Sequence, residues 1–328
     1  MSFWLQLPRP FFVLAPMEDV TDTVFRRIVA GCGRPEVMVT EFTSVEGLAS
    51  KGFSRVVQRL EYTSAEQPLV AQIWGITPEH YYQAAQIARD WGFAGLDINM
   101  GCPVKKIIQN GACSALIKNP SLATDIIQAA QEGAADMPVS VKTRLGFSTI
   151  QTEEWIGHIL GHHLAALTIH MRTVKDMSRV SARWEEMKKI TQLRDSYAPE
   201  TLLIGNGDIM SYQEGVDKAR DYHLDGVMIG RGVFQNPWIF NSQVNVKDIT
   251  PVDKLSLLMQ HIDLFQETWG DRKNVDILKK FFKVYVNGIP GASDLRARLV
   301  QYRDYQSFRD IVTEYAHERG YCSKAHIN

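Results

Sequence analysis

Short apolar runs rich in β-branched residues recur along the first three quarters of the chain. Such a run of about four to eight residues is typical of a buried strand. Stretches with helical spacing separate most of them; one over residues 77–92 has Thr77 as its expected N-cap and Pro78 in its first turn. The eight predicted strands are residues 11–16, 36–42, 68–74, 95–100, 138–144, 166–171, 201–207 and 225–232.

Eight strand–helix units over roughly 240 residues are the number expected for a closed TIM (β/α)8 barrel. An open, doubly wound sheet also alternates strands with helices. That fold usually carries G-x-G-x-x-G after its first strand, whereas this chain continues with APMEDVTD. The pattern therefore favours an α/β protein built on a TIM barrel.

The strand pattern stops after about residue 251, and helical periodicity continues to the end of the chain. Residues 252–270 form one amphipathic stretch, and the following helices are expected to break near Gly288 and Pro290. We therefore expect a barrel domain over residues 1–243 and a small all-helical domain over residues 244–328.

The chain has 328 residues and a formal net charge of −1, which excludes binding to polyanions through overall charge. Residues 272–309 nevertheless hold nine basic and three acidic residues, a local charge of +6, with aromatic residues between them. A solvated helix face would explain these charges, and so would a surface that binds a nucleic-acid backbone.

Cysteine use and the N-terminus bear on the compartment. The N-terminus lacks a basic start and is interrupted by Pro8 and Pro10, and no apolar run approaches the roughly 18 residues of a membrane span. We therefore expect a soluble protein, and we expect it to be a monomer. The cysteines form no C-x-x-C pair, which argues against a metal site or a disulfide framework and favours a reducing cytoplasm. The four cysteines are Cys32, Cys102, Cys113 and Cys322.

Chemistry in a TIM barrel takes place at the carboxyl ends of the strands. A polar or reactive residue follows every predicted strand, and together these residues predict a ring around one pocket. They are Met17, Glu18, Glu41, Gln72, Asn99, Cys102, Lys142, Arg144, His170, Arg172, Asn206, Asp208 and Arg231.

Two glycine-containing segments, GNGDI (205–209) and GRGVF (230–234), end the seventh and eighth strands, where this fold usually binds phosphate. Lys142 suits a flat ring that becomes anionic on reduction, although a buried ion pair would also explain it. Gln72 suits the imide edge of such a ring. FMN fits these features together, whereas a small phosphosugar fits fewer of them.

Several motifs occur in an order that resembles the tRNA-dihydrouridine synthases. They are APMEDVTD, VAQIWG, DINMGCPVKK, VKTRLG, IHMRT, GNGDI, IGRG and KKFFKVYVNGIPGASDLRARL. The resemblance implies an FMN-binding TIM barrel followed by a helical tRNA-binding domain. It also implies reduction of one uridine of tRNA to 5,6-dihydrouridine, with NADPH as the usual electron source (NAD(P)H in general).

The resemblance also implies roles for individual residues. Cys102 matches the catalytic cysteine, and Glu41 and Asn99 match positions near the target base; we add Arg144 and Arg172 as substrate-binding residues. In the basic segment, Lys283, Arg296 and Arg298 are expected to contact tRNA. The residues that match flavin contacts are Pro16, Met17, Glu18, Gln72, Lys142, His170, Asn206, Gly207, Asp208, Gly230 and Arg231.

Two residues depart from the family pattern. Met171 stands where the family often has glycine, and Arg183 replaces an acid common before the tryptophan. These differences concern the loop after the sixth predicted strand and the choice of uridine in tRNA.

The position of Cys102 suggests a mechanism. Hydride addition to C6 of uracil leaves charge that a proton at C5 must quench, and a thiol with a pKa of about 8.5 can donate it. A nucleophilic role would instead need a thiolate, favoured by Lys105 or Lys106. A buried turn residue is the structural alternative. We favour the acid role and expect the other three cysteines to be dispensable.

Three other functions fit parts of the chain. A TIM-barrel FMN reductase of a small molecule, of the dihydroorotate or enoate type, leaves the basic segment without a role. A Schiff-base aldolase would use Lys142 and need no flavin. A non-catalytic RNA-binding protein leaves the cysteine, the lysine and the glycine loops unexplained.

Overall fold

The computed structural model describes residues 2–321, which form two compact units. The first unit comprises the residues up to Thr23 together with Pro35–Gly230, and the second comprises Val24–Arg34 together with the residues from Arg231 onward. The sequence places its domain boundary at 243/244, whereas the division between the two units falls after Gly230. Cys322 lies outside the described residues.

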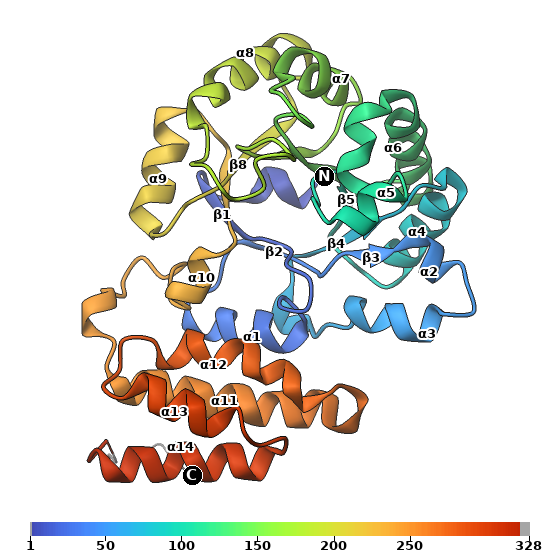
Figure 1. Ribbon diagram of the computed structural model, residues 1–328. Helices are drawn as coiled ribbons and strands as arrows, with labels where there is room; N and C mark the ends of the chain where they lie inside the picture. The colour runs from blue at the N-terminus through green and yellow to red at the C-terminus, as the bar shows by residue number, and fades with distance from the viewer. Residues whose placement is uncertain (1, 322–328) are drawn as a thin grey trace. The chain divides into compact units, whose positions relative to one another are not determined.

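The first unit is built on a closed barrel of eight parallel strands (Figure 1). Each strand pairs with its neighbours, and β9 pairs with β1 from Phe11↔Gly226 to Leu14↔Ile229, which closes the ring. A two-residue strand, β3 (Thr43–Ser44), pairs with β4 outside this ring. The barrel strands are β1 (Phe11–Leu14), β2 (Val37–Val39), β4 (Leu69–Trp74), β5 (Gly95–Asn99), β6 (Val139–Arg144), β7 (Ala166–His170), β8 (Leu202–Asn206) and β9 (Gly226–Ile229).

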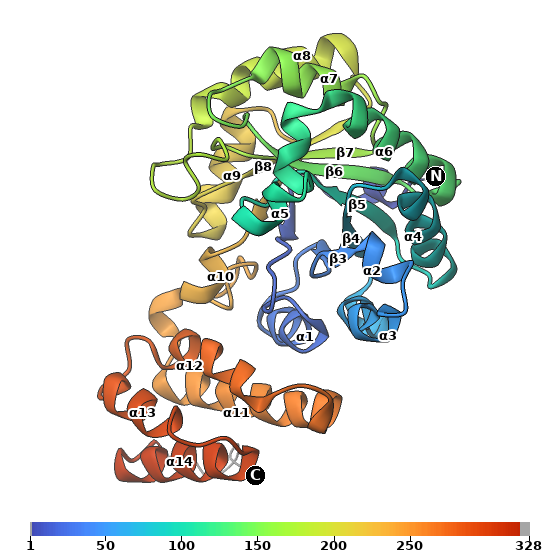
Figure 2. The same cartoon turned by 45° about the vertical axis from the view of Figure 1, so that its right-hand side comes forward.

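All eight predicted strands are therefore confirmed. The closed barrel is also confirmed, and the alternative of an open sheet is excluded. Helices surround the strands on the outside, as Figures 1 and 2 show. The helices of this unit are α2 (Val45–Leu48), α3 (Phe53–Val56), α4 (Pro78–Asp90), α5 (Lys105–Gln109), α6 (Pro120–Ala134), α7 (Gly157–Leu160), α8 (Met187–Tyr197) and α9 (Tyr212–Asp221).

The barrel interior is filled by alternate residues of the strands. Phe11 and Val13 pack in the central apolar cluster with residues of β2, β4, β7, β8 and β9, and Trp4 from the 3-10 helix Phe3–Gln6 joins them. Phe12, on the opposite side of β1, stacks on Tyr212 of α9 with ring centroids 4.4 Å apart. The period of two along β1 thus separates an inner core from a layer between strand and helix.

Helix α4 confirms the predicted helix over residues 77–92, but its N-terminus is capped differently from the expectation. Thr77 occupies the N-cap position, yet its side chain makes no capping hydrogen bond. The carboxylate of Glu46 instead accepts hydrogen bonds from the N–H groups of Ile76 at 2.8 Å and Thr77 at 3.3 Å. A carboxylate from another element therefore supplies the negative charge that a helix N-terminus favours.

The second unit is all-helical in its described part. Helix α11 (Pro251–Trp269) closely matches the predicted stretch, and α12 (Lys279–Val286) and α13 (Ala292–Leu299) lie on either side of the predicted break, where Gly288 and Gly291 adopt positive φ angles. Helices α1 (Thr23–Cys32), α10 (Gly232–Gln235) and α14 (Tyr305–Glu318) complete it. Phe25 of α1 packs on Phe281 of α12, with centroids 5.0 Å apart, so an N-terminal helix contributes to the core of this unit.

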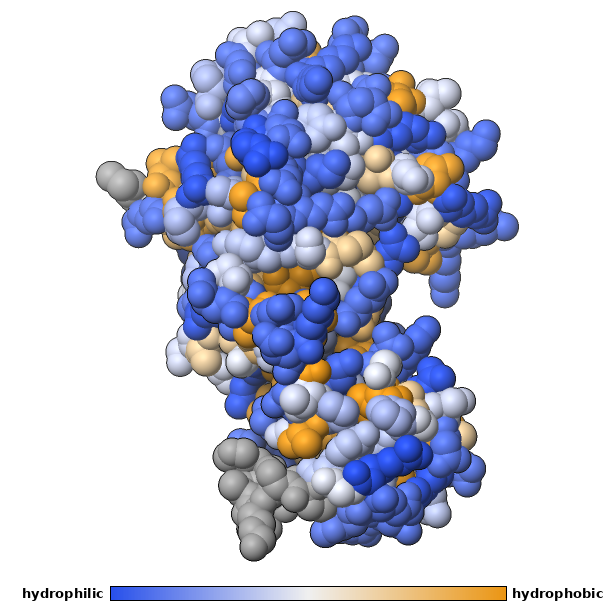
Figure 3. Space-filling model, turned by 90° about the vertical axis from the view of Figure 1, so that its left-hand side faces the viewer, coloured by the Kyte–Doolittle hydropathy of each residue, from blue (hydrophilic) through white to orange (hydrophobic). Residues whose placement is uncertain are grey.

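The face shown in Figure 3 is mostly hydrophilic, with apolar side chains gathered in several patches. Within residues 2–321, no helix combines the length and the apolar character that crossing a bilayer requires.

The close approach of α4 and α6 gives a test of the packing. A Cβ built on Gly133 of α6 would lie 2.2 Å from the backbone oxygen of Tyr82 in α4. We expect Gly133→Ala to lower the free energy of unfolding by about 1–3 kcal/mol, as overpacking does. Denaturant unfolding of the full chain measures this change. Gly157→Ala is the control, because a Cβ there meets nothing within 4 Å; equal stability of the two variants would contradict the packing.

Candidate active site

The carboxyl ends of the parallel strands bring the predicted polar residues of the first unit to one end of the barrel. Asn99 on β5 pairs in register with Lys142 on β6, Arg144 on β6 pairs with His170 on β7, and His170 pairs with Asn206 on β8. Gly230 is the last residue of the first unit, and Arg231 opens the second unit directly before α10.

A chain of buried hydrogen bonds fixes the side chain of Gln72. Its Nε2 donates to Oδ2 of Asp97 at 2.7 Å, and its Oε1 accepts from Nδ2 of Asn99 at 3.0 Å. Ser140 donates to the other oxygen of Asp97 at 2.6 Å. Burial raises the pKa of Asp97 to about 6, although the hydrogen bonds from Ser140 and Gln72 oppose this shift. The amide of Gln72 is therefore held in one orientation.

Asn99 also holds the turn that carries Cys102. Its Oδ1 accepts hydrogen bonds from the N–H groups of Gly101 and Cys102, each at 3.0 Å. The hydroxyl of Ser114 donates to the carbonyl of Cys102 at 2.7 Å. Cys102 itself is partly exposed. The thiol is thus presented by a fixed turn at the end of β5 and does not serve as a buried packing residue.

The surroundings of Cys102 make its thiol more acidic than an ordinary one. A hydrogen bond with the Cys113 side chain lowers the pKa of Cys102 to about 7; a backbone hydrogen bond at Val104 and the charge of Arg144 act in the same direction, while burial and Glu18 oppose them. The two lysines that follow in sequence, Lys105 and Lys106, are exposed at the start of α5. The cations that act on the thiol are therefore Arg144 and Lys142 of β6.

Lys142 reaches across the end of the barrel to an amide. Its Nζ donates to Oδ1 of Asn206 at 3.1 Å, and Nδ2 of Asn206 donates to the carbonyl of Met228 at 2.8 Å. Burial and the neighbouring Arg144 lower the pKa of Lys142 to about 8. No carboxylate among the described residues forms an ion pair with Lys142, so the buried ion pair considered from the sequence is absent from this part of the chain.

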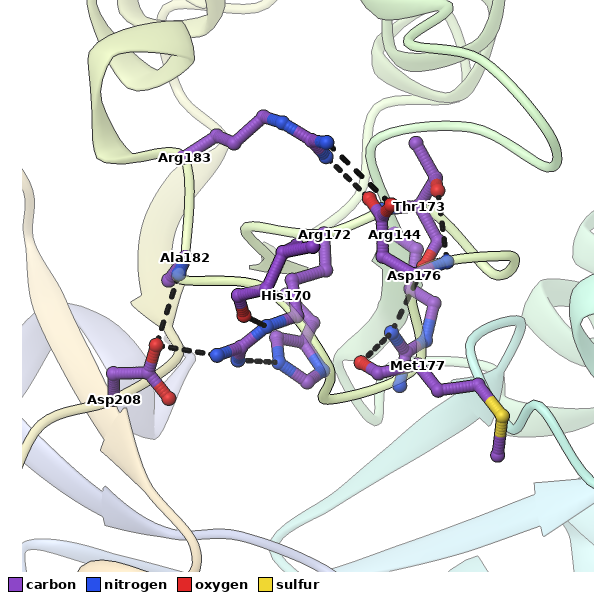
Figure 4. A network of polar contacts seen from close by, with 10 residues as sticks. Arg144, His170, Arg172, Thr173, Asp176, Met177, Ala182, Arg183 and Asp208 are labelled. Atoms are coloured by element: carbon purple, nitrogen blue, oxygen red, sulfur yellow. Dashed lines mark hydrogen bonds and ion pairs between the residues drawn. The ribbon is translucent and has the colours of Figure 1, made fainter.

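Two buried arginines brace the loop after β7, as Figure 4 shows. Arg172 forms an ion pair with Asp208, contacts Nε2 of His170 at 3.0 Å and donates to the carbonyl of Val180 at 2.7 Å. Arg144 donates to the carbonyls of Gly101 at 2.7 Å and of Thr173 and Met177 at 3.2 Å. Both guanidinium groups thus have protein partners, and their contact with a substrate stays a prediction.

The two departures from the family pattern lie in this loop. Met171 is fully buried, and its carbonyl accepts a hydrogen bond from the N–H of Arg183 at 2.7 Å. The Arg183 side chain forms an ion pair with Asp176, and this hydrogen bond lowers the pKa of Asp176 to about 2. Trp184 then donates to the carbonyl of Gly207 at 3.0 Å. Arg183 therefore contacts Met171 at the start of the loop through its backbone N–H and Asp176 in the middle of the loop through its side chain.

The glycine loops differ in how strictly they require glycine. Gly207 has φ +134°, and a Cβ there would lie 3.0 Å from the Cβ of Ala182, so only glycine fits without strain. Gly230 has ordinary surroundings, with Ala15 and Met17 at 3.5 and 3.8 Å from a built Cβ. Asp208 also has positive φ, at 55°. The loop after β8 thus requires glycine at position 207, whereas the loop after β9 does not require it at position 230.

The segment after β1 is ordered by its own contacts. The N–H of Met17, which follows Pro16, donates to the hydroxyl of Thr21 at 2.9 Å. Glu18 forms an ion pair with Arg59 at 2.6 Å. Glu41 is only 2% exposed. The flavin role predicted for Glu18 and the substrate role predicted for Glu41 stay predictions.

Three residues that shape the site were missing from the sequence-based set. Asp97 could have been predicted from the sequence, because it precedes Asn99 by two positions on one strand and therefore lies on the same face of that strand. Cys113 and Ser114 had none, because only the tertiary fold brings them to Cys102.

The chain matches the family model described as "Dihydrouridine synthase (Dus)" over residues 13–319. It is 46% identical over 323 residues to "Probable tRNA-dihydrouridine synthase 2" of Bacillus subtilis (strain 168), covering 98% of both chains. It is 44% identical over 317 residues to "Probable tRNA-dihydrouridine synthase" of Staphylococcus aureus (strain COL), covering 96% of this chain and 95% of the relative.

Two solved structures share the barrel fold at low sequence identity. Histamine dehydrogenase from Rhizobium sp. 4-9 has a TM-score of 0.53 and 12% identity, covering 77% of this chain and 48% of that one. The 6-hydroxypseudooxynicotine amine oxidase from Pseudomonas geniculata N1 has a TM-score of 0.54 and 12% identity, covering 77% and 50%. These two similarities concern the fold alone.

The bonds made by Asn99 give a test of the turn. Asn99→Ala removes the acceptor for two backbone N–H groups, and we expect it to lower the free energy of unfolding by about 1–3 kcal/mol, the cost of leaving such groups unsatisfied. Denaturant unfolding measures the change. Asn110→Ala is the control, since that side chain is exposed and makes no hydrogen bond with residues 2–321. A stable Asn99 variant would show that the turn holds itself.

Proposed function

The chain belongs to the dihydrouridine synthase family, and from this premise we propose that it reduces a uridine of tRNA to 5,6-dihydrouridine, with Cys102 as the proton donor. The observation that carries this proposal is the turn at Cys102, a partly exposed residue whose backbone is hydrogen-bonded to Asn99 and Ser114. Lys142, His170 and Asn206 lie at the same end of the barrel, at or near the ends of their strands.

The residues of the first unit fit FMN as the cofactor. Lys142 has an amide oxygen as its partner and keeps its charge for a reduced ring, while the fixed amide of Gln72 suits the imide edge of a flavin. The loop after β8, where Gly207 and Asp208 have positive φ, is the proposed place of the flavin phosphate. When bound, the flavin supplies the hydride that adds to C6 of the uracil ring. We further propose that the electrons come from NAD(P)H, with NADPH preferred.

The role of Cys102 is to deliver a proton to C5. With a pKa of about 7, its thiol is still about half protonated near neutral pH, and a pKa near the working pH is the optimum for a general acid. Arg144 acts on the thiolate that remains, since its charge already favours that form. Asn99 holds the backbone of the turn, so the thiol meets the base in one position.

The second unit is proposed to bind tRNA, although part of its basic segment is neutralised within the protein. Asp276 pairs with Lys279 at 2.7 Å and with Arg303 at 3.5 Å, and Arg298 pairs with Glu314. Lys283 is exposed and Arg296 is partly exposed; neither forms an ion pair with a residue in the range 2–321. Lys283 and Arg296 are therefore the better candidates for phosphate contacts, and Arg298 is a weaker one.

We expect Cys102→Ala to slow uridine reduction by roughly 10²-fold or more, the scale for losing a general acid, without loss of flavin. In the parent, the single-turnover rate with reduced flavin should fall as pH rises above about 7, because the donor must be protonated. Dihydrouridine in tRNA, measured by mass spectrometry across pH, tests both. Cys32→Ala, in a buried site of the second unit, should match the parent. A rate that instead rises through pH 7 would indicate a nucleophilic thiolate.

Phosphate contacts release counterions, so tRNA binding should weaken as salt rises. Lys283→Ala with Arg296→Ala should lower affinity and flatten the slope of log K against log salt by about 0.7–0.9 per lost contact. Arg298→Ala should have a smaller effect, because that side chain already pairs with Glu314. Binding titrations at several salt concentrations measure these slopes. Arg220→Ala on α9, an exposed arginine paired with Asp217 and Asp221, should bind like the parent.

An unchanged salt slope in the double variant would mean that this segment is an ordinary solvated surface. The small-molecule FMN reductase would then explain the barrel better than a tRNA-modifying enzyme.

A further inference from the structure

The last residue of β4, Trp74, lies at the carboxyl end of the barrel and faces its inside. Successive side chains of a strand point to opposite faces, so residues 70, 72 and 74 of β4 share one face. Val70 belongs to the apolar cluster of the barrel interior, and Gln72 is hydrogen-bonded to Asp97 on β5. Trp74 is the next residue on this face, and its indole therefore lies above Gln72 at the mouth of the barrel.

The register of the sheet places Trp74 beside the turn that carries Cys102. The pairing of β4 with β5 runs up to Ile73↔Ile98, so the next positions along the two strands are Trp74 and Asn99. Asn99 holds the Cys102 turn by accepting hydrogen bonds from two of its backbone N–H groups. Trp74 and Cys102 therefore line the same part of the mouth.

The contacts of Trp74 with the rest of the protein leave part of its ring uncovered. Trp74 and Phe42 are both partly exposed, and they meet edge-on with ring centroids 6.3 Å apart and planes at 76°. Within residues 2–321 the indole N–H of Trp74 donates to no acceptor, and it is not among the buried polar atoms that lack a partner. Aromatic surface and one hydrogen-bond donor are thus open to a ligand at the mouth.

The rim near Trp74 is apolar, unlike the rim at β6. Ile76 is 40% exposed, and Val104, which precedes α5, is 49% exposed. A Cβ built on Gly111, just after α5, would lie 3.9 Å from Ile76, so these apolar residues belong to one region. Lys142 and Arg144 make the β6 side cationic instead. A phosphate suits the cationic side, and the flat face of a nucleobase suits the aromatic one.

We propose that Trp74 is a substrate-binding residue, whose indole stacks on the nucleobase next to the target uridine of tRNA while Phe42 supports the indole from the side. The inference rests on the proposed function for the identity of its ligand. It adds a residue that was absent from the sequence-based set.

The chemistry of the substrate explains why such a residue is needed. An enzyme that acts on a base must take that base out of its stack, and the neighbouring base then loses a stacking partner. Aromatic side chains commonly receive unstacked bases of RNA. The target uracil must leave its C5 and C6 atoms open to the proton and hydride donors. The base that stacks on Trp74 is therefore a neighbour of the target and not the target itself.

The test combines two measurements on the full, flavin-loaded chain. Ultraviolet cross-linking to tRNA, with the joined residue and nucleotide read from fragment masses, locates the contact without turnover. Steady-state reduction of tRNA gives KM and kcat for the parent, Trp74→Leu and Trp74→Phe. Leucine keeps an apolar side chain but cannot stack, whereas phenylalanine can. Trp91→Leu is the control, because Trp91 is exposed and follows α4 at the opposite end of the barrel.

We expect Trp74 to cross-link to a nucleotide adjoining the uridine that is reduced. Trp74→Leu should raise KM for tRNA roughly tenfold, the scale for losing one stacked base, with a smaller change in kcat. Trp74→Phe should recover most of this loss. Flavin content and flavin reduction by NADPH should match the parent in both variants, which shows that the barrel is folded. Trp91→Leu should leave KM unchanged.

A leucine variant with the KM of the parent would overturn the inference, and so would a phenylalanine variant as weak as leucine. Cross-links at other residues of the barrel but not at Trp74 would overturn it too. If the parent forms dihydrouridine while these results hold, the inference alone fails. A parent that cross-links through Trp74 but forms no dihydrouridine would defeat the proposed function and leave the stacking contact standing.

Discussion

The pairing of β9 with β1 is the interaction on which the arrangement of the site depends. It closes eight parallel strands into a ring, and a closed parallel ring must present all its carboxyl ends on one side. Residues that are far apart in sequence, such as Gln72 and Asn206, thereby reach one end of the barrel. Phe11 and Val13 belong to the apolar cluster that fills the interior of the barrel.

Electrostatics at this end are dominated by cations with few carboxylate partners. Lys142 and Arg144 lie two residues apart on β6. Burial and the charge of Arg144 lower the pKa of Lys142, and burial and the charge of Arg172 lower the pKa of Arg144. The acids that act on this group include Asp97, Asp176, Asp208 and Glu18, and each has a hydrogen-bond or ion-pair partner in the protein. Such a site favours anions: a phosphate, a reduced flavin ring or a thiolate. The same charge that suits the proposed cofactor thus also suits Cys102 after it has lost its proton.

Much of this arrangement could be predicted from the sequence, because β-branched runs and strand-end polar residues are local signals. The eight strands and the break between α12 and α13 follow from such signals. Other features depend on contacts between distant segments: Glu46 caps α4 in place of Thr77, and α1 joins the helical unit although it lies between two barrel strands. The hydrogen bond from Ser114 to the Cys102 carbonyl belongs to this second group, since twelve positions and helix α5 separate the two residues.

We propose that this barrel reduces a base within tRNA and not a free small molecule. The most direct test incubates the purified, flavin-loaded protein and NADPH with tRNA that lacks dihydrouridine, and separately with free orotate or a simple enone. We expect fragment mass mapping to find one uridine of the tRNA that has gained two hydrogen atoms, while the small molecules are left unreduced. Unchanged tRNA together with rapid reduction of a small molecule would contradict it.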